Sequence, residues 1–353
     1  MEPESKVQTL IWEGKSLKLI DQRKLPFAVE YVVCDTYEKV GIAIKEMVVR
    51  GAPAIGVTAA YGAAIAGIQY TGSSKRDFIK YMEKAIKFLS SSRPTAVNLF
   101  WALKRMREVL NKSKNLEIEI IRQNLIQEAK KIEIEDISIN RKIGENGLEA
   151  FKDFKGNIKI LTHCNAGALA TAGYGTALGV VRSLAAAGKI RYVIVDETRP
   201  YLQGARLTAW ELEQEKIPFF IITDSAAAYM MSIGEVDSVI VGADRIASNG
   251  DSANKVGTLS ISISALYYRI PFFIAAPLST IDMSIENGQQ IPIEERGEKE
   301  VREVMGTKII SDKIPVRNPA FDVTPAKNIS AIITEKGVIK PPYKENIAQI
   351  FGK

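Results

Sequence analysis

The pattern of apolar and polar positions divides the chain into two parts with different periodicities. The first part begins with β-favouring runs and continues with helical ones. Asp35 and Glu38 have the spacing of a capping box, and the apolar positions after them recur at helical intervals, which predicts a helix to about Arg50. Pro53 suits the first turn of the next helix. The expected strands are Thr9–Trp12, Ser16–Ile20 and Phe27–Val33, and further helices are expected over 75–89, 96–111 and 118–145.

From residue 158 onward, short apolar runs alternate with helix-length segments. The runs are Ile158–Leu161, Tyr192–Val195, Phe219–Ile222, Ser238–Val241, Phe272–Ala275 and Ala331–Thr334. Such runs predict a parallel sheet that is buried on both faces. We therefore expect an α/β chain: residues 1–125 form a small, mostly helical N-terminal domain with a short β-sheet, and residues 126–353 form a Rossmann-like domain with a mainly parallel sheet.

Two stretches with almost no charge, Gly51–Tyr70 and Ala166–Gly188, are long enough to raise the question of a membrane span. Both consist largely of alanine and glycine, whereas insertion needs about 20 residues dominated by Leu, Ile, Phe or Val. We interpret them as buried helices and expect no membrane partner. The N-terminal sequence MEPESKVQTL is acidic and polar, unlike a signal peptide, so we expect a cytoplasmic protein.

Composition and charge narrow the classes of ligand. The 353 residues are 46% hydrophobic and 25% charged, and the net charge of +6 is spread along the chain, which favours small anionic ligands over nucleic acid. Cys34 and Cys164 are the only cysteines and have no metal-binding spacing, which fits a reducing compartment. His163 is the single histidine, so we expect no metal site.

Polar clusters follow several of the expected strands, and they carry the candidate chemistry. Because ligands bind beyond the carboxyl ends of strands in open α/β sheets, we expect the clusters to meet at one crevice. Each of Cys164 and Asp244 comes three residues after a strand, where a carboxylate freed from water can act as a general acid. The alternatives are a small buried side chain for Cys164 and a helix N-cap for Asp244, while His163 is expected to be structural.

Two further features concern phosphate groups. Gly173, Gly175 and Gly179 loosely resemble a dinucleotide-binding loop, but they come too late after the strand, so we expect them inside a helix, and no nucleotide cofactor is expected. Arg50 followed by Gly51 and Ala52 combines a guanidinium, a permissive backbone and a helix start, all of which suit an anion. Arg50 could instead cap a helix end. Four loop residues are either ligand contacts or solvated surface: Arg93, Gln203, Asn254 and Lys255.

Taken together, these segments resemble the methylthioribose-1-phosphate isomerases. The resemblance rests on the stretches RGAPAIG from Arg50, THCNAGALA from Thr162, DETRP from Asp196, TDSA from Thr223 and GADR from Gly242, and it spans nearly the whole chain. It implies an aldose–ketose isomerase of methionine salvage that converts 5-methylthioribose 1-phosphate to 5-methylthioribulose 1-phosphate as a homodimer.

The resemblance also implies roles for individual residues. Asp244 is expected to be the proton donor, and Cys164 a catalytic or transition-state-stabilising residue. The implied substrate contacts are Arg50, Gly51, Ala52, Arg93, Gln203, Asn254 and Lys255. The hydrogen that moves from C2 to C1 travels either through an enediol-like intermediate or as a direct hydride shift, and a dry pocket favours the second route.

The resemblance leaves two alternatives open, one with the same fold and one that resembles the second domain. A ribose-1,5-bisphosphate isomerase shares the cysteine and the aspartate but needs further basic groups for a second phosphate. A regulatory subunit of the exchange factor for translation initiation factor 2 is a binding protein, and it has no need for Cys164, Asp244 or the RGAPAIG stretch.

Overall fold

The computed structural model describes residues 6–93 and 97–352, and these form two compact units. The helical unit comprises residues 6–138 and 168–175, and the sheet unit comprises residues 139–167 and 176–352. The chain first passes from one unit to the other inside helix α5 (Ile118–Ala150), which also contains the expected domain boundary at 125/126. That boundary stays a prediction, because compactness alone does not identify the segments that fold independently.

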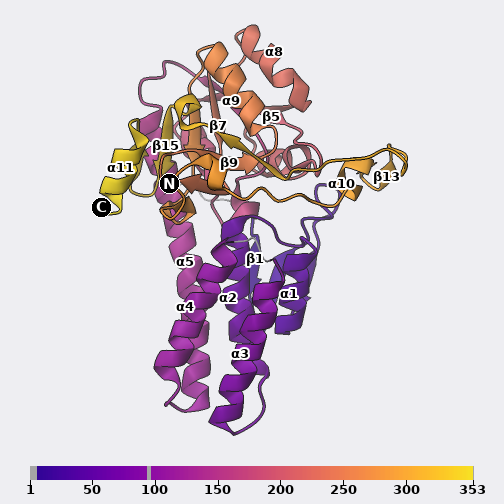
Figure 1. Cartoon of the computed structure of the whole chain (residues 1–353), viewed down its shortest axis with the longest axis vertical. Helices are drawn as coiled ribbons and strands as arrows, with labels where there is room; N and C mark the ends of the chain where they lie inside the picture. The colour runs from indigo at the N-terminus through magenta and orange to yellow at the C-terminus, as the bar shows by residue number, and fades with distance from the viewer. Residues whose placement is uncertain (1–5, 94–96, 353) are drawn as a thin grey trace. The chain divides into compact units, whose positions relative to one another are not determined.

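The helical unit combines a small antiparallel sheet with a group of helices (Figure 1). Its strands pair in the order β1 (Leu10–Trp12), β2 (Leu17–Ile20) and β3 (Tyr31–Cys34). Its helices are α1 (Tyr37–Lys45), α2 (Ala52–Gln69), α3 (Lys75–Ser91), α4 (Val97–Ser113) and the first part of α5. The three expected strands are confirmed, although the third begins at Tyr31 rather than Phe27.

Helix α2 forms the centre of this unit. Helices α1, α3 and α4 all contact it, and α5 adds Leu125 and Ile132 to the same apolar core. In the described part of the chain, α2 is the one helix whose length and composition would allow it to cross a membrane, and 78% of that window is buried. Burial on nearly all sides explains its uniformly apolar sequence, as expected for a core helix.

Helix α1 is shorter than the sequence predicts. It ends at Lys45 rather than near Arg50, because Met47 adopts a left-handed backbone conformation with φ 59°. The Val48 amide then donates to the Ala43 carbonyl at 2.9 Å, which closes the helix in the manner of a Schellman motif. At the other end, Thr36 is the N-cap, and its hydroxyl accepts the Lys39 N–H.

The sheet unit is built on seven strands. Their order is β16, β15, β10, β7, β4, β5, β6, and all neighbours are parallel except β15 and β16. The bounds are β4 (Ile158–Thr162), β5 (Ile190–Asp196), β6 (Phe219–Ile222), β7 (Ser238–Val241), β10 (Phe272–Ala275), β15 (Ala331–Thr334) and β16 (Gly337–Ile339). All six expected strands are confirmed, and the sheet is mainly parallel as predicted.

Helices cover both faces of this sheet. Alternate residues of one strand enter different cores: Phe272 packs with one set of apolar side chains, and Phe273 with another. The covering helices are α6 (Ala177–Ala186), α7 (Ala209–Gln214), α8 (Ala227–Ser232), α9 (Thr258–Tyr267) and α11 (Tyr343–Ile350). Figure 1 labels α8, α9 and α11. The fold is therefore the expected α/β arrangement, in which helices account for the continuous apolar runs of the strands.

Smaller elements complete the sheet unit. A four-stranded sheet has the order β11 (Ile281–Asp282), β8 (Arg245–Ala247), β9 (Ser252–Lys255), β14 (Phe321–Thr324). The strands β12 (Glu303–Val304) and β13 (Thr307–Lys308) form a hairpin after the short helix α10 (Lys299–Arg302). Among these elements, β9 ends in two of the candidate site residues, Asn254 and Lys255.

The stretch Ala166–Gly188 is only partly helical, which corrects the sequence prediction. Helix α6 begins at Ala177, so Gly173 and Gly175 lie before it and only Gly179 lies within it. The Thr171 hydroxyl accepts the amide protons of Gly173 and Gly175, and these bonds hold the segment in a turn instead of a helix.

Gly51 provides a test of how the helical unit is packed. It has φ 91°, and a Cβ there would lie 2.4 Å from the Ala170 carbonyl oxygen. We expect Gly51→Ala to lower the melting temperature, since the backbone strain alone costs roughly 1–3 kcal/mol and the clash adds to it. The matched control is Gly14→Ala: Gly14 has φ 82°, and a Cβ there meets no described atom within 4 Å. Equal losses in calorimetry would contradict the packing argument.

Candidate active site

The two residues on which the sequence hypothesis depends follow adjacent strands. β4 and β7 pair in parallel, with Leu161 opposite Val239, and the chain continues from them to Cys164 and Asp244. From β4 the chain adds β5 and β6 on one side of the sheet, whereas β7, β10 and β15 are added on the other. The strand order therefore reverses between β4 and β7, and such a reversal is where open α/β sheets bind ligands.

Cys164 is half-buried and has an unusual backbone. Its φ is 64°, a left-handed conformation that costs a residue with a Cβ roughly 1–2 kcal/mol. Its amide donates to the Thr198 hydroxyl at 2.8 Å, and its carbonyl accepts from the Thr208 hydroxyl at 2.6 Å. Cys34, by contrast, is fully buried, and burial raises the pKa of its thiol to about 11. Of the two thiols, only Cys164 combines access with backbone strain, a combination that is typical of functional sites.

Asp244 lies in the turn between β7 and β8, not at the start of a helix, so the N-cap alternative is wrong. Its amide donates to the Ala253 carbonyl at 2.9 Å, which fixes it beside β9. The side chain is exposed. The shielding from water that the sequence reasoning expected is therefore not found here, because a tight turn after a strand leaves its side chain at the rim of the sheet.

Asn254 and Lys255 end strand β9, and both are buried. The Asn254 amide donates to the Thr258 hydroxyl at 3.1 Å, and the Lys255 ammonium lies 4.7 Å from the centre of the Phe321 ring. Burial lowers the pKa of Lys255, while the negative charges that Cys164 and Asp244 can carry act in the opposite direction. Asp244 bonds Ala253, two residues before Lys255, and His163 bonds Val256, the residue after it. These contacts bring Cys164, Asp244 and Lys255 to one locality.

Gln203 follows β5 at the same edge of the sheet, immediately before a π-helical turn at Gly204–Thr208. It is buried, and its Oε1 has no hydrogen-bond partner among the described residues. Gly204 lets the turn approach β5 closely, because a Cβ there would lie 1.7 Å from the Asp196 carbonyl oxygen. A buried amide oxygen without a partner is suited to accept a hydrogen bond from a hydroxyl group of a ligand.

Four expected substrate contacts belong to the helical unit. Gly51 is the N-cap of α2, Ala52 is its first residue, and Pro53 lies in its first turn, as predicted. Arg50 is buried but lies beyond the end of α1 rather than ending that helix. Arg93 is half-buried and lies two residues beyond α3, while the neighbouring Pro94 is outside the described residues. That these residues bind phosphate stays a prediction.

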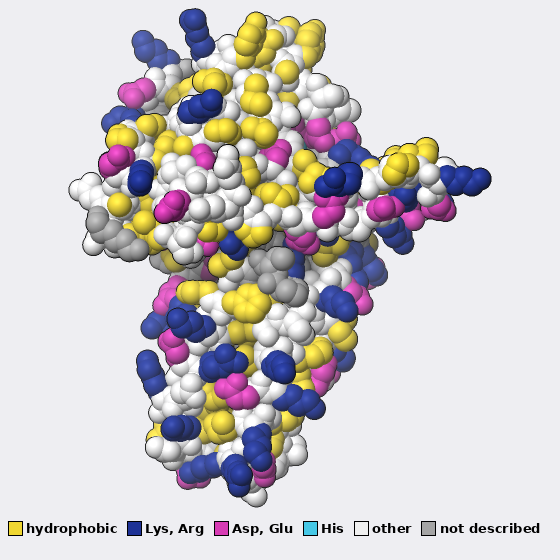
Figure 2. All heavy atoms as spheres, in the orientation of Figure 1, with side chains coloured by type: hydrophobic (Ala, Val, Ile, Leu, Met, Phe, Trp, Pro, Cys, Tyr) yellow, Lys and Arg dark blue, Asp and Glu magenta, His cyan; other side chains and the backbone are white. Residues whose placement is uncertain are grey.

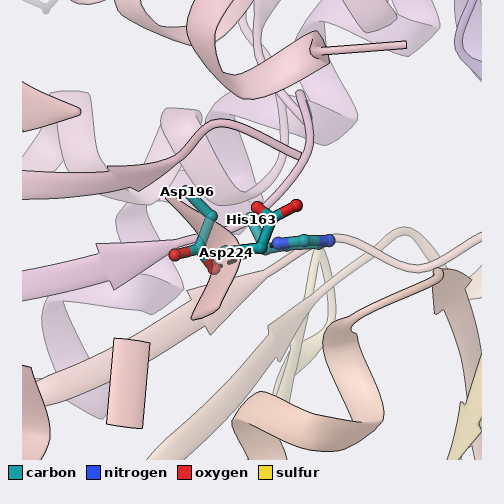
Figure 3. A group of neighbouring side chains, drawn as sticks. All are labelled: His163, Asp196 and Asp224. Carbon is teal, nitrogen blue, oxygen red and sulfur yellow. Dashed lines mark hydrogen bonds and ion pairs between the residues drawn. The ribbon is translucent and has the colours of Figure 1, made fainter. Parts of the chain in front are cut away.

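A buried polar cluster joins the loops after three neighbouring strands. Figure 3 shows its members, His163 after β4, Asp196 at the end of β5 and Asp224 after β6. His163 Nδ1 lies 3.0 Å from Asp196 Oδ2, and Nε2 lies 2.9 Å from the Val256 carbonyl oxygen. Asp224 accepts the amide protons of Thr198 and Arg199, each at 2.7 Å. The structural role expected for His163 agrees with these contacts.

The hydrogen bonds of His163 determine where its protons lie. A carbonyl can only accept, so Nε2 carries a proton toward Val256, and the contact between Nδ1 and Asp196 then needs a second proton. Burial opposes the charged imidazole, but the hydrogen bond and charge of Asp196 outweigh it and raise the pKa of His163. Burial also raises the pKa of Asp196, against the influence of His163. Both directions favour a proton held between the two groups, as the two contacts of His163 require.

The same three side chains offer oxygen and nitrogen atoms that all lie within 4.8 Å of one another, as a metal site would. However, both oxygens of Asp224 already accept backbone protons, and Nδ1 of His163 already bonds Asp196. A cation would have to compete with these bonds. We therefore interpret the cluster as a hydrogen-bonded junction between loops.

A second buried network, of ion pairs and hydrogen bonds around Arg182, was not predicted from the sequence. Arg182 of α6 forms ion pairs with Glu211 at 2.6 Å and with Glu215 at 2.8 Å. Glu211 also accepts a hydrogen bond from the Asn165 side-chain amide at 2.8 Å. Asn165 is the neighbour of Cys164. The signal available in the sequence was the single charge, Arg182, in an otherwise uncharged stretch, because a buried arginine requires buried acidic partners.

The shared proton between His163 and Asp196 predicts a pH dependence of stability. A histidine whose folded pKa is raised contributes stability that is fully present below its unfolded pKa of about 6.5 and is lost as the pH rises through the folded pKa. In Asp196→Asn an amide proton replaces the shared one. We expect the melting temperature of the wild type, minus that of Asp196→Asn, to fall as the pH rises above about 6.5.

The control for this measurement is Asp35→Asn. Asp35 is exposed, and its pKa is lowered by its bond with Lys39, so it stays ionised across this range and its difference curve is expected to be flat. A curve for Asp196→Asn that is flat or rises with pH would show that the pair does not hold the proton.

The chain is similar in sequence to a known protein family and to several named proteins. The model of the initiation factor 2 subunit family matches residues 48–341. A methylthioribose-1-phosphate isomerase of Caldicellulosiruptor saccharolyticus is 57% identical over 97% of this chain and 98% of its own length. One of Thermotoga neapolitana is 54% identical over 98% of this chain and 99% of its own length.

Two solved structures are similar over nearly the whole chain. The 5-methylthioribose 1-phosphate isomerase of Pyrococcus horikoshii has a TM-score of 0.94 at 45% identity and covers 99% of this chain and 97% of its own. A structure titled as the delta subunit of translation initiation factor eIF-2B from A. fulgidus has a TM-score of 0.89 at 42% identity and covers 99% and 100%. The chain belongs to the initiation factor 2 subunit family, and it aligns along nearly its whole length with methylthioribose-1-phosphate isomerases.

Proposed function

We propose that this protein is an aldose–ketose isomerase that converts 5-methylthioribose 1-phosphate to 5-methylthioribulose 1-phosphate in methionine salvage. The similarity to relatives with that name supports the substrate. The observation that carries the chemistry is the pair Cys164 and Asp244, which follow the two strands at the reversal of the sheet. A thiol and a carboxylate at that point suit acid–base work on a sugar.

The reaction needs three changes that balance without a cofactor. The ring oxygen takes a proton as the bond between C1 and that oxygen breaks. The hydrogen on C2 moves to C1, either as a hydride or through an enediol-like intermediate. The C2 hydroxyl loses its proton as the C2 carbonyl forms, and this proton restores the acid. No metal or organic cofactor is part of the proposal.

We assign to Asp244 the donation of the proton that opens the ring. We assign to Cys164 a role beside C1 and C2, the carbons between which the hydrogen moves. Because Asp244 is exposed in the structure, bound substrate must exclude water from it before it can act as an acid near neutral pH. The buried Asn254 and Lys255 are assigned to sugar hydroxyls as donors, and the unpartnered Oε1 of Gln203 as an acceptor.

The phosphate is assigned to groups of the helical unit. Arg50 and Arg93 supply guanidinium groups, which bind phosphate with paired hydrogen bonds. Gly51 and Ala52 supply the first backbone amides of α2, an 18-residue helix whose N-terminus attracts an anion. These assignments rest on the chemistry of each residue and on the resemblance of the RGAPAIG stretch.

Two other functions are alternatives. A ribose-1,5-bisphosphate isomerase would use the same cysteine and aspartate on a second sugar phosphate. A translation-factor subunit is favoured by one observation, the 42% identity to the structure titled as an eIF-2B delta subunit. That alternative assigns no task to the strained, half-buried Cys164 or to the buried Lys255 near it.

We also propose a cytoplasmic homodimer that binds neither nucleic acid nor membrane. Both cysteines, which lie within the described residues, are free thiols, as suits a reducing compartment. Exposed apolar side chains gather on the face of the sheet unit that carries α8 and α9 (Figure 2). They are Phe220, Tyr229, Ile233, Ile263, Leu266 and Tyr267. A patch of this kind suits a second copy of the chain.

The catalytic assignment is tested with purified protein and both sugar phosphates. We expect wild type to form the ketose from 5-methylthioribose 1-phosphate, and Cys164→Ser and Asp244→Asn to lose about 10²–10⁴-fold in kcat with unchanged melting temperature. Cys34→Ala and Asp35→Asn are the matched controls and should retain kcat. Full turnover by either site variant would refute its role, and no ketose from either substrate would favour the translation-factor alternative.

The dimer is tested by sedimentation. We expect Ile263→Glu combined with Tyr267→Glu to convert the protein to monomers, because each change buries a charge in an apolar contact. Ile134→Glu is the control, since Ile134 is exposed on α5 outside this face and the variant should stay dimeric. A double variant that sediments like wild type would exclude this face as the interface.

A further inference from the structure

Two buried threonines hold the backbone of Cys164 from both sides. The Thr198 hydroxyl accepts the Cys164 amide proton at 2.8 Å, and the Thr208 hydroxyl donates to the Cys164 carbonyl at 2.6 Å. Both threonine side chains are buried, with exposed fractions of 0%. A left-handed conformation with φ 64° is unfavourable for a residue with a Cβ. These two hydrogen bonds therefore stabilise a conformation that Cys164 would not favour by itself.

Each threonine is itself fixed by a network. Thr198 also has a positive φ, 63°; its hydroxyl donates to the Asp196 carbonyl, and its amide donates to Asp224. These contacts leave the Thr198 hydroxyl one role toward Cys164, that of acceptor. The Thr198 side therefore connects Cys164 to the loops after β5 and β6.

The Thr208 side connects Cys164 to a helix. Thr208 is the last residue of the π-helical turn Gly204–Thr208, a rare geometry that is enriched at functional sites. Its hydroxyl accepts from the Asn165 amide at 3.2 Å, and that amide also donates to Glu211, which Arg182 holds. Glu211 is fully buried, and Gly167 leaves the space for its carboxylate, 2.3 Å from where a Cβ would be.

We propose that Thr198 and Thr208 are positioning residues that fix Cys164 in its left-handed conformation and so present its thiol to the substrate. This rests on the proposed function of Cys164. Neither hydroxyl needs to touch the reacting atoms, since both bond the Cys164 backbone. The arrangement differs from ordinary loop packing. The amide and the carbonyl of Cys164 are both bonded by side chains of distant segments, 34 and 44 positions away in the sequence.

The test replaces each hydroxyl by a methyl group of similar size. In Thr198→Val and Thr208→Val we expect kcat to fall about tenfold or more while KM changes little, because a thiol displaced by a fraction of an ångström loses rate rather than substrate binding. Thr198→Ser and Thr208→Ser keep the hydroxyl and should restore most of kcat. Thr324→Val is the control, since Thr324 is buried and its hydroxyl has no partner among the described residues.

A double variant separates positioning from a structural role. If Thr198 acts through the thiol, Thr198→Val should not lower the residual rate of Cys164→Ser any further, whereas a general loss of structure would lower it by the same factor as in wild type. If the valine variants do not fold, Thr198→Ser compared with Thr198→Ala decides whether the hydroxyl matters.

The outcomes separate the two proposals. Valine variants that fold and keep wild-type kcat, or serine variants as impaired as the valine ones, would overturn the positioning role while Cys164→Ser remained inactive. Wild-type turnover by Cys164→Ser would instead remove the function proposed for Cys164 itself.

Discussion

The reversal of strand order between β4 and β7 is the constraint on which the rest of this molecule depends. From these two strands the sheet grows in opposite directions, and such a reversal is where open α/β sheets bind ligands. The loops that follow them carry Cys164 and Asp244, and β9 brings Lys255 to the same locality. The chemistry thus follows from a topology that the buried apolar strands impose, rather than from a motif contained in one segment.

Keeping polar loops at this edge requires buried polar partners. His163, Asp196 and Asp224 join the loops after three strands, and Arg182 with Glu211 ties the neighbouring loop to α6. Buried charges are costly unless they are paired, so removing one partner leaves the other uncompensated. These bonds hold loops in which Cys164, Thr198 and Leu202 have left-handed backbones.

The sequence predicted the elements better than their connections. Continuous apolar runs predicted strands such as Ser238–Val241 and Phe272–Ala275 with the observed bounds, because burial on both faces leaves a local signature. The end of α1 and the turn at Gly173 and Gly175 were missed, since each depends on hydrogen bonds rather than on periodicity. Strand order and the partners of Arg182 involve pairings distant in sequence, which periodicity does not report, and the exposure of Asp244 depends on the whole turn.

The lone histidine has a practical consequence. Since the chain of 353 residues contains one imidazole, and it lies between the loops of β4 and β5, every histidine resonance in a magnetic resonance spectrum comes from this single junction. Uniform isotope labelling would be sufficient, without assignment of any other residue. The protein thereby carries its own reporter for whether the loops beside Cys164 are closed or open to solvent.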